Sequence, residues 1–158
     1  MLALYNVTMK LVEIYTDGAC SGNPGIGGWA SILSFNGIEK TFSGGEPNTT
    51  NNKMELTAIL EGLKRLKEPC EVVVYSDSQY AVSPFIDGRI NAWILSGWKT
   101  ADKKDVKNVE LWKSIVELTK VHSVKFVKVK GHADNEKNNA CDKIARGEID
   151  KIKKSLPF

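Results

Sequence analysis

The sequence has few of the residues that build disulfide frameworks or zinc sites. Its 158 residues include three cysteines, an odd number without a C-x-x-C pair, and two histidines. This pattern predicts buried thiols in a reducing compartment. No apolar run is long enough to cross a bilayer, and the apolar start at residues 1–8 lacks a basic front and a cleavage-like site. We therefore expect a cytoplasmic protein without a signal peptide and without a membrane partner.

Internal repeats, low-complexity tracts and linkers are also absent from the sequence. Residues 1–158 are therefore expected to form one domain, which is long enough to bury a core without disulfides. The net charge is only +3, but residues 120–130 carry four lysines and no acid. This stretch fits either a solvated basic face or a surface for a polyanion. The basic tail at residues 151–158 is expected to fray.

What the sequence does contain is an alternation of strand-forming and helix-forming stretches. Five stretches rich in β-formers predict strands at residues 11–16, 29–35, 38–43, 71–77 and 124–129. Apolar residues at helical spacing predict a helix over about 52–67 that Pro69 ends. Residues 79–121 are expected to be mostly helical with interruptions at Pro84 and Gly88, and a last helix follows a polar loop at 131–139. The alternation indicates an α/β fold.

The stretch between Thr16 and Trp29 is the most distinctive part of the sequence. It holds five glycines and one proline, which predicts a sharply bent connection with exposed backbone. Asp17 stands at the end of the first predicted strand, where an acid has no packing value, although Asp-Gly is also a common turn pair. Asp77 ends a later strand in the same way. In open α/β sheets, chemistry gathers beyond the carboxyl ends of the strands.

Two further acids are candidates for the same place. Glu55 lies on the apolar side of its helix, where a carboxylate needs a cationic partner, although the helix dipole also favours an acid in the first turn. Asp142 is expected in the first turn of the last helix. If these acids converge with Asp17 and Asp77, they raise one another's pKa, and divalent cations relieve the repulsion. Carboxylate oxygens suit Mg²⁺ or Mn²⁺, and two such ions can hold the attacking water and the leaving oxygen of a phosphodiester.

The two histidines have different expected roles. His132 follows Gly131 in the polar loop and could move protons near such a site, although a lone histidine is more often structural. His122 lies between a helix and a strand, and we expect it to be structural.

The motifs around these residues resemble those of type 1 ribonuclease H. They occur in the family's order at residues 16–18, 22–29, 49–56, 76–80, 97–100, 129–133 and 138–142. The resemblance spans about residues 11–146 and implies a five-stranded mixed sheet of order 3-2-1-4-5, flanked by helices. It also implies a metal-dependent endonuclease that hydrolyses the RNA strand of RNA–DNA hybrids and leaves 5′-phosphate and 3′-hydroxyl ends.

The resemblance further implies roles for individual residues. The metal ligands would be Asp17, Glu55, Asp77 and Asp142, holding two Mg²⁺ ions that Mn²⁺ can replace, and His132 would transfer protons or aid product release. The substrate contacts would be Asn23, Thr50, Asn51, Asn52, Gln79, Trp93, Trp98, Lys99, Lys103 and Lys104. Amides suit contacts with 2′-hydroxyl groups because they both donate and accept hydrogen bonds. For the two tryptophans, packing in the core is an equally good explanation. Residues 94–97 between the tryptophans carry no basic charge, so we expect a shortened basic protrusion.

Three functions are compatible with these observations. The first is a hybrid-specific ribonuclease, acting as a monomer on RNA–DNA hybrids. The second is a non-catalytic hybrid-binding module, which would gain nothing from clustered negative charge facing phosphate. The third is another enzyme of the wider fold, such as a DNA-cutting nuclease or a strand-transfer enzyme. The amide-rich contact set favours RNA.

Overall fold

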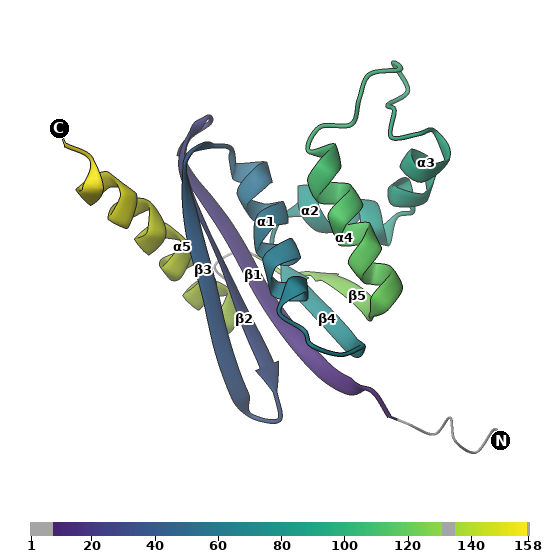
Figure 1. Ribbon diagram of the computed structural model, residues 1–158, viewed down its shortest axis with the longest axis horizontal. Helices are drawn as coiled ribbons and strands as arrows, with labels where there is room; N and C mark the ends of the chain where they lie inside the picture. The colour runs from purple at the N-terminus through teal and green to yellow at the C-terminus, as the bar shows by residue number, and fades with distance from the viewer. Residues whose placement is uncertain (1–7, 131–134, 158) are drawn as a thin grey trace.

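The five strands predicted from the sequence are all present and form one mixed sheet. The computed structural model describes residues 8–130 and 135–157. The elements of these residues are β1 (Lys10–Gly22), β2 (Gly25–Phe35), β3 (Ile38–Thr49), α1 (Asn51–Lys64), β4 (Cys70–Ser76), α2 (Gln79–Ile86), α3 (Arg89–Leu95), α4 (Val109–Val121), β5 (Ser123–Lys128) and α5 (Glu136–Ser155). The strand order is β3-β2-β1-β4-β5, in which β2 is antiparallel to both β1 and β3, β4 is parallel to β1, and β5 is parallel to β4 (Figure 1). The expected α/β fold and strand order are confirmed.

The two faces of the sheet are covered by different helices (Figure 1). On one face the apolar stripe of α1 is fully buried at Leu56, Ile59 and Leu63, and it shares a core with Trp112 of α4. On the other face α5 packs on β1 and β2 through a smaller cluster of Tyr15, Ala30, Ile32, Cys141 and Ala145. None of the helices within the described ranges combines the length and apolar character needed to cross a bilayer.

The glycine-rich stretch is a long β-hairpin, which corrects the predicted bent connection. Strand β1 continues to Gly22 and β2 begins at Gly25, so the turn is confined to Asn23 and Pro24. A side chain at Gly18 would lie 2.5 Å from the carbonyl carbon of Met54 in α1, and one at Gly28 would overlap the Ala145 carbonyl oxygen in α5. The glycines therefore let both helices lie directly on the sheet. Asp17 is consequently inside β1 and not at its end.

Four other expectations about where elements begin, end or are interrupted were also wrong. Strand β3 runs to Thr49, because residues 44–49 continue the pairing with β2. Pro84 lies inside α2 and does not interrupt it. Helix α5 begins at Glu136, so Asp142 is in its second turn, and it continues to Ser155, so the expected fraying tail is largely helical. Within this extension Ile152 is half-buried, and its Cδ1 lies close to Gly45 of β3.

Candidate active site

The candidate site lies where two parallel strands separate. Strands β1 and β4 are paired from Lys10–Cys70 to Tyr15–Tyr75, and beyond that point β1 continues with β2 while β4 leads into α2. Asp17 and Asp77 each stand two residues beyond the last pair. Both carboxylates therefore reach the same gap in the sheet, as the sequence predicted.

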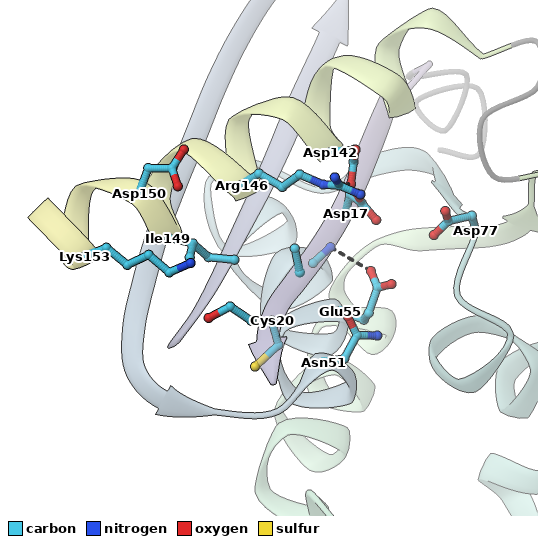
Figure 2. A pocket seen from close by; sticks show the side chains of 13 residues that line it. Asp17, Cys20, Asn51, Glu55, Asp77, Asp142, Arg146, Ile149, Asp150 and Lys153 are labelled. Carbon is cyan, nitrogen blue, oxygen red and sulfur yellow. Dashed lines mark hydrogen bonds and ion pairs between the residues drawn. The ribbon is translucent and has the colours of Figure 1, made fainter. Parts of the chain in front are cut away.

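Helices from the two faces of the sheet bring the other two acids to this gap. The Oε1 atom of Glu55, from α1, accepts a hydrogen bond of 2.8 Å from the backbone N–H of Gly18. One carboxylate oxygen each from Asp17, Glu55 and Asp77 lies within 4.8 Å of the others. Asp142, from α5, borders the same groove beside Asp17 (Figure 2). The four predicted acids thus line one open groove of about 630 Å³.

Two of the four acids in this groove are more buried than carboxylates usually are. Asp17 and Glu55 are each only 5% exposed. The pKa of Asp17 is raised to about 8, first by burial and then by Asp77 and Asp142, while the Gly18 N–H opposes the shift. Burial, followed by the charge of Asp17, also raises the pKa of Glu55 well above its usual value. Closely spaced oxygen donors that repel one another fit a hard divalent cation.

The metal-free protein is expected to lose stability as the pH rises from about 4 to about 8. Asp17 has a pKa of about 8 in the folded chain and 3.8 when unperturbed, so in this window the folded chain keeps a proton that the unfolded chain has released. Each rise in pH then favours unfolding. Asp17→Asn removes this proton linkage, so in EDTA it is expected to be more stable than the wild type at pH 8 by about 1–3 kcal/mol. Urea denaturation at a series of pH values gives the free energy of unfolding of both proteins. The same dependence of this free energy on pH in both proteins would contradict the expectation.

The predicted amide contacts lie around the start of α1 and α2. The backbone N–H of Asn51 donates to Oδ1 of Asn23 at 3.3 Å, which ties the hairpin turn to α1, and Asn51 also lines the groove. Thr50 is the N-cap of α1 and accepts from the Lys53 N–H. Asn52 is exposed in the first turn of α1, and Gln79 is exposed at the start of α2.

The predicted tryptophan and lysine contacts form a separate region around α3 and the loop that follows it (Figure 1). The rings of Trp93 and Trp98 are 6.2 Å apart, and Trp93 packs on the buried Trp112 at 5.4 Å. Both are half-buried, so core packing explains part of their presence. Lys99 forms an ion pair with Asp105. The remaining predicted lysines of this region, Lys103 and Lys104, are exposed.

One predicted residue falls outside the described part of the chain. His132, with Gly131 before it, belongs to residues 131–134, so its role stays a prediction. His122 is buried, and its Nδ1 accepts a hydrogen bond from the Cys70 backbone N–H at 3.1 Å. This contact confirms the structural role expected for His122.

A row of groove residues on α5 was not predicted from the sequence. Arg146 donates to Asp142 at 3.2 Å, and Ile149, Asp150 and Lys153 continue along the same wall of the groove (Figure 2). The spacing of Asp142 and Arg146 is that of an ion pair on a helix, which is a signal available in the sequence. Lys153 was missed because the helix was expected to fray from residue 151.

Comparison with known proteins gives one consistent family. The family model described as RNase H matches residues 9–150. A ribonuclease H of Acetivibrio thermocellus is 56% identical over 146 residues, which cover 92% of this chain and 99% of the relative. A ribonuclease H of Caldicellulosiruptor saccharolyticus is 56% identical over 145 residues, which cover 92% of this chain and 100% of the relative.

Solved structures agree with the sequence relatives. LC9-RNase H1, a type 1 RNase H with the type 2 active-site motif, is 26% identical with a TM-score of 0.81, covering 92% of this chain and 75% of that one. LC11-RNase H1 in complex with an RNA/DNA hybrid is 25% identical with a TM-score of 0.67, covering 89% of this chain and 98% of that one.

Proposed function

The chain belongs to the ribonuclease H family as a metal-dependent endonuclease that cleaves RNA in RNA–DNA hybrids, and we propose that Asp17, Glu55, Asp77 and Asp142 hold two Mg²⁺ ions for this reaction. The observation that carries the proposal is the convergence of three carboxylates within 4.8 Å at the gap between β1 and β4. Mn²⁺ has the same preference for oxygen ligands and is the expected substitute. A divalent ion bound there supplies an activated water and neutralises charge on the scissile phosphate.

The chain's own contribution is to hold these acids in place before the substrate arrives. The Gly18 N–H fixes the carboxylate of Glu55 at 2.8 Å, and Arg146 holds Asp142 at 3.2 Å. Charged ligands that are already oriented need little rearrangement when the reaction begins. We propose that cleavage leaves 5′-phosphate and 3′-hydroxyl ends, and that His132 moves protons or aids product release.

The hybrid is proposed to lie across the acidic groove and across the tryptophan and lysine region around α3. Thr50 and Asn52 are proposed to make phosphate and strand contacts, and the turn at Asn23 lets backbone groups come close to the hybrid. The amides of Asn51 and Gln79 are proposed to contact 2′-hydroxyl groups and base edges. A 2′-hydroxyl both donates and accepts, which suits these side chains and distinguishes RNA from DNA. The residues proposed to contact the DNA strand are Trp93, Trp98, Lys99, Lys103 and Lys104. We further propose that residues 1–158 act as one domain and as a monomer in the cytoplasm.

A single cleavage assay tests this function. Matched duplexes of RNA–DNA, RNA–RNA and DNA–DNA are incubated with the full chain, with Mg²⁺ or with EDTA. We expect cleavage of the RNA strand in the hybrid alone, and only with Mg²⁺. Binding of the hybrid without cleavage would identify a binding module, and cleavage of the DNA duplex would identify a DNA nuclease.

A further inference from the structure

Asn138 of α5 occupies the point at which β1 and β4 stop pairing. Its side chain is buried, as only 7% of the residue is exposed. The Nδ2 atom donates to the carbonyl oxygen of Thr16 at 3.2 Å and to that of Tyr75 at 3.1 Å. The Asn138 side chain therefore joins the two strands just beyond the end of their own hydrogen-bond ladder, where the Thr16 hydroxyl also donates to the Tyr75 carbonyl oxygen at 3.2 Å.

The two carbonyls that Asn138 binds belong to residues one and two positions before the candidate metal ligands Asp17 and Asp77. The Thr16 carbonyl belongs to the peptide group that leads into Asp17, and the Tyr75 carbonyl precedes Ser76 and Asp77. Asp142 is four residues after Asn138 on the same helix, so it projects from the same side of α5. The position of Asn138 is thus mechanically linked to three of the four acids.

Only a hydrogen-bond donor fits this position. Both partners are carbonyl oxygens, so the NH₂ group of the amide must face them. The Oδ1 atom is buried and has no hydrogen-bond partner within residues 8–130 and 135–157. An unsatisfied buried acceptor is destabilising, so the amide adds less stability than its two hydrogen bonds alone would give. The amide is therefore better explained by what it holds in place than by its contribution to stability.

We propose that Asn138 is a positioning residue that sets the separation of the Asp17 and Asp77 backbones and thereby prepares the acids for cations. This inference rests on the proposed function of the acids. Asn138 lies behind the carboxylates and contacts backbone atoms of the strands, so it acts on the metal ligands and not on the substrate. Its loss should lower metal affinity and turnover while leaving hybrid binding unchanged.

Asn138→Asp keeps the shape of the side chain, replaces the NH₂ donor with an oxygen and places a negative charge against the two carbonyls. The full chain is compared with the wild type in kcat and KM on the hybrid, and in the Mg²⁺ dissociation constant of the substrate-free protein by calorimetry. Replacing a residue that orients metal ligands commonly lowers metal affinity or activity by about 10–100-fold, and we expect a change of this size in kcat and in the Mg²⁺ dissociation constant. KM for the hybrid is expected to stay within about twofold of the wild type, because the variant removes no contact with the bound substrate.

Two further variants separate positioning from general stability. Ile144→Ala removes a half-buried side chain of α5 that packs in the cluster beneath the helix, so it lowers stability without removing a hydrogen bond to the strand ends. It should leave kcat and Mg²⁺ binding as in the wild type. Asn138→Ser keeps a donor on a smaller side chain, so its kcat and Mg²⁺ affinity are expected to lie between those of the wild type and Asn138→Asp. If Asn138→Asp does not fold, Asn138→Ser serves as the test.

Two results would overturn the inference. Wild-type kcat and Mg²⁺ affinity in the folded Asn138 variants would show that the strand ends do not need this side chain. An equal loss in Ile144→Ala would show that the effect is one of stability. Failure of the wild type itself to cleave the hybrid would instead count against the proposed function, so the two failures are distinguishable.

Discussion

Asp17→Asn is expected to abolish RNA cleavage while hybrid binding survives. Asp17 is buried beside Asp77 and Asp142, and an amide of the same size replaces a carboxylate that we propose as a metal ligand. The transition state then loses charge stabilisation, and a loss of about 4 kcal/mol corresponds to about a thousand-fold decrease in kcat. Hybrid affinity should be unchanged, because Asp17 is buried and the substitution removes none of the proposed substrate contacts.

Single-turnover cleavage and filter binding measure the two quantities separately. Glu71→Gln is a matched control, since Glu71 is an exposed acid of β4 at the end remote from the groove, and it should leave both unchanged. Treatment of the wild type with EDTA should reproduce the loss of cleavage. Cleavage by Asp17→Asn within about tenfold of the wild type would mean that the transition state does not depend on this ligand.

Gly18→Ala is expected to have the second largest effect, on both stability and activity. The added carbon would lie 2.5 Å from the Met54 carbonyl carbon and closer still to the Glu55 nitrogen. Both are backbone atoms, so a side-chain rotation cannot relieve the clash. Helix α1 must then shift as a unit, which breaks the Gly18–Glu55 hydrogen bond. Overpacking of this kind costs about 1–3 kcal/mol of stability. Displacing a ligand by about 1 Å can lower the rate about a hundred-fold.

Gly147→Ala is the control for the introduced methyl group. A side-chain carbon added at Gly147 of α5 would meet no atom of another described element within 4 Å. Alanine should therefore raise stability by about 0.5–1 kcal/mol and leave cleavage unchanged. Urea denaturation and the cleavage assay compare both variants with the wild type. A Gly18→Ala protein with wild-type stability and activity would contradict the close packing of α1 on β1.

The element types could be predicted because burial leaves a local pattern in the sequence. Leu56, Ile59 and Leu63 recur at helical spacing, and all three are fully buried. The extent of β1 and β2 could not be predicted, because Gly18 and Gly28 have the local chemistry of a turn. Only the docking of α1 and α5 on opposite faces explains why glycine is needed inside these strands.

The acids of the site were easier to predict than their supports. Asp77 follows a run of valines and so indicates a strand end, and the resemblance to ribonuclease H indicated the same residues. The roles of Asn138 and Gly18 depend on contacts between elements far apart in the sequence, such as the hydrogen bond from Asn138 to Thr16. No local pattern carries that information.

The most direct test of a shared cation site is a Mg²⁺ titration of the ¹⁵N-labelled wild-type chain, followed by backbone amide shifts. Saturable shifts are expected at and beside Asp17, Glu55, Asp77 and Asp142, and they should disappear in Asp17→Asn. Shifts that are absent, scattered over the surface or unchanged in Asp17→Asn would show that these carboxylates do not bind a cation together.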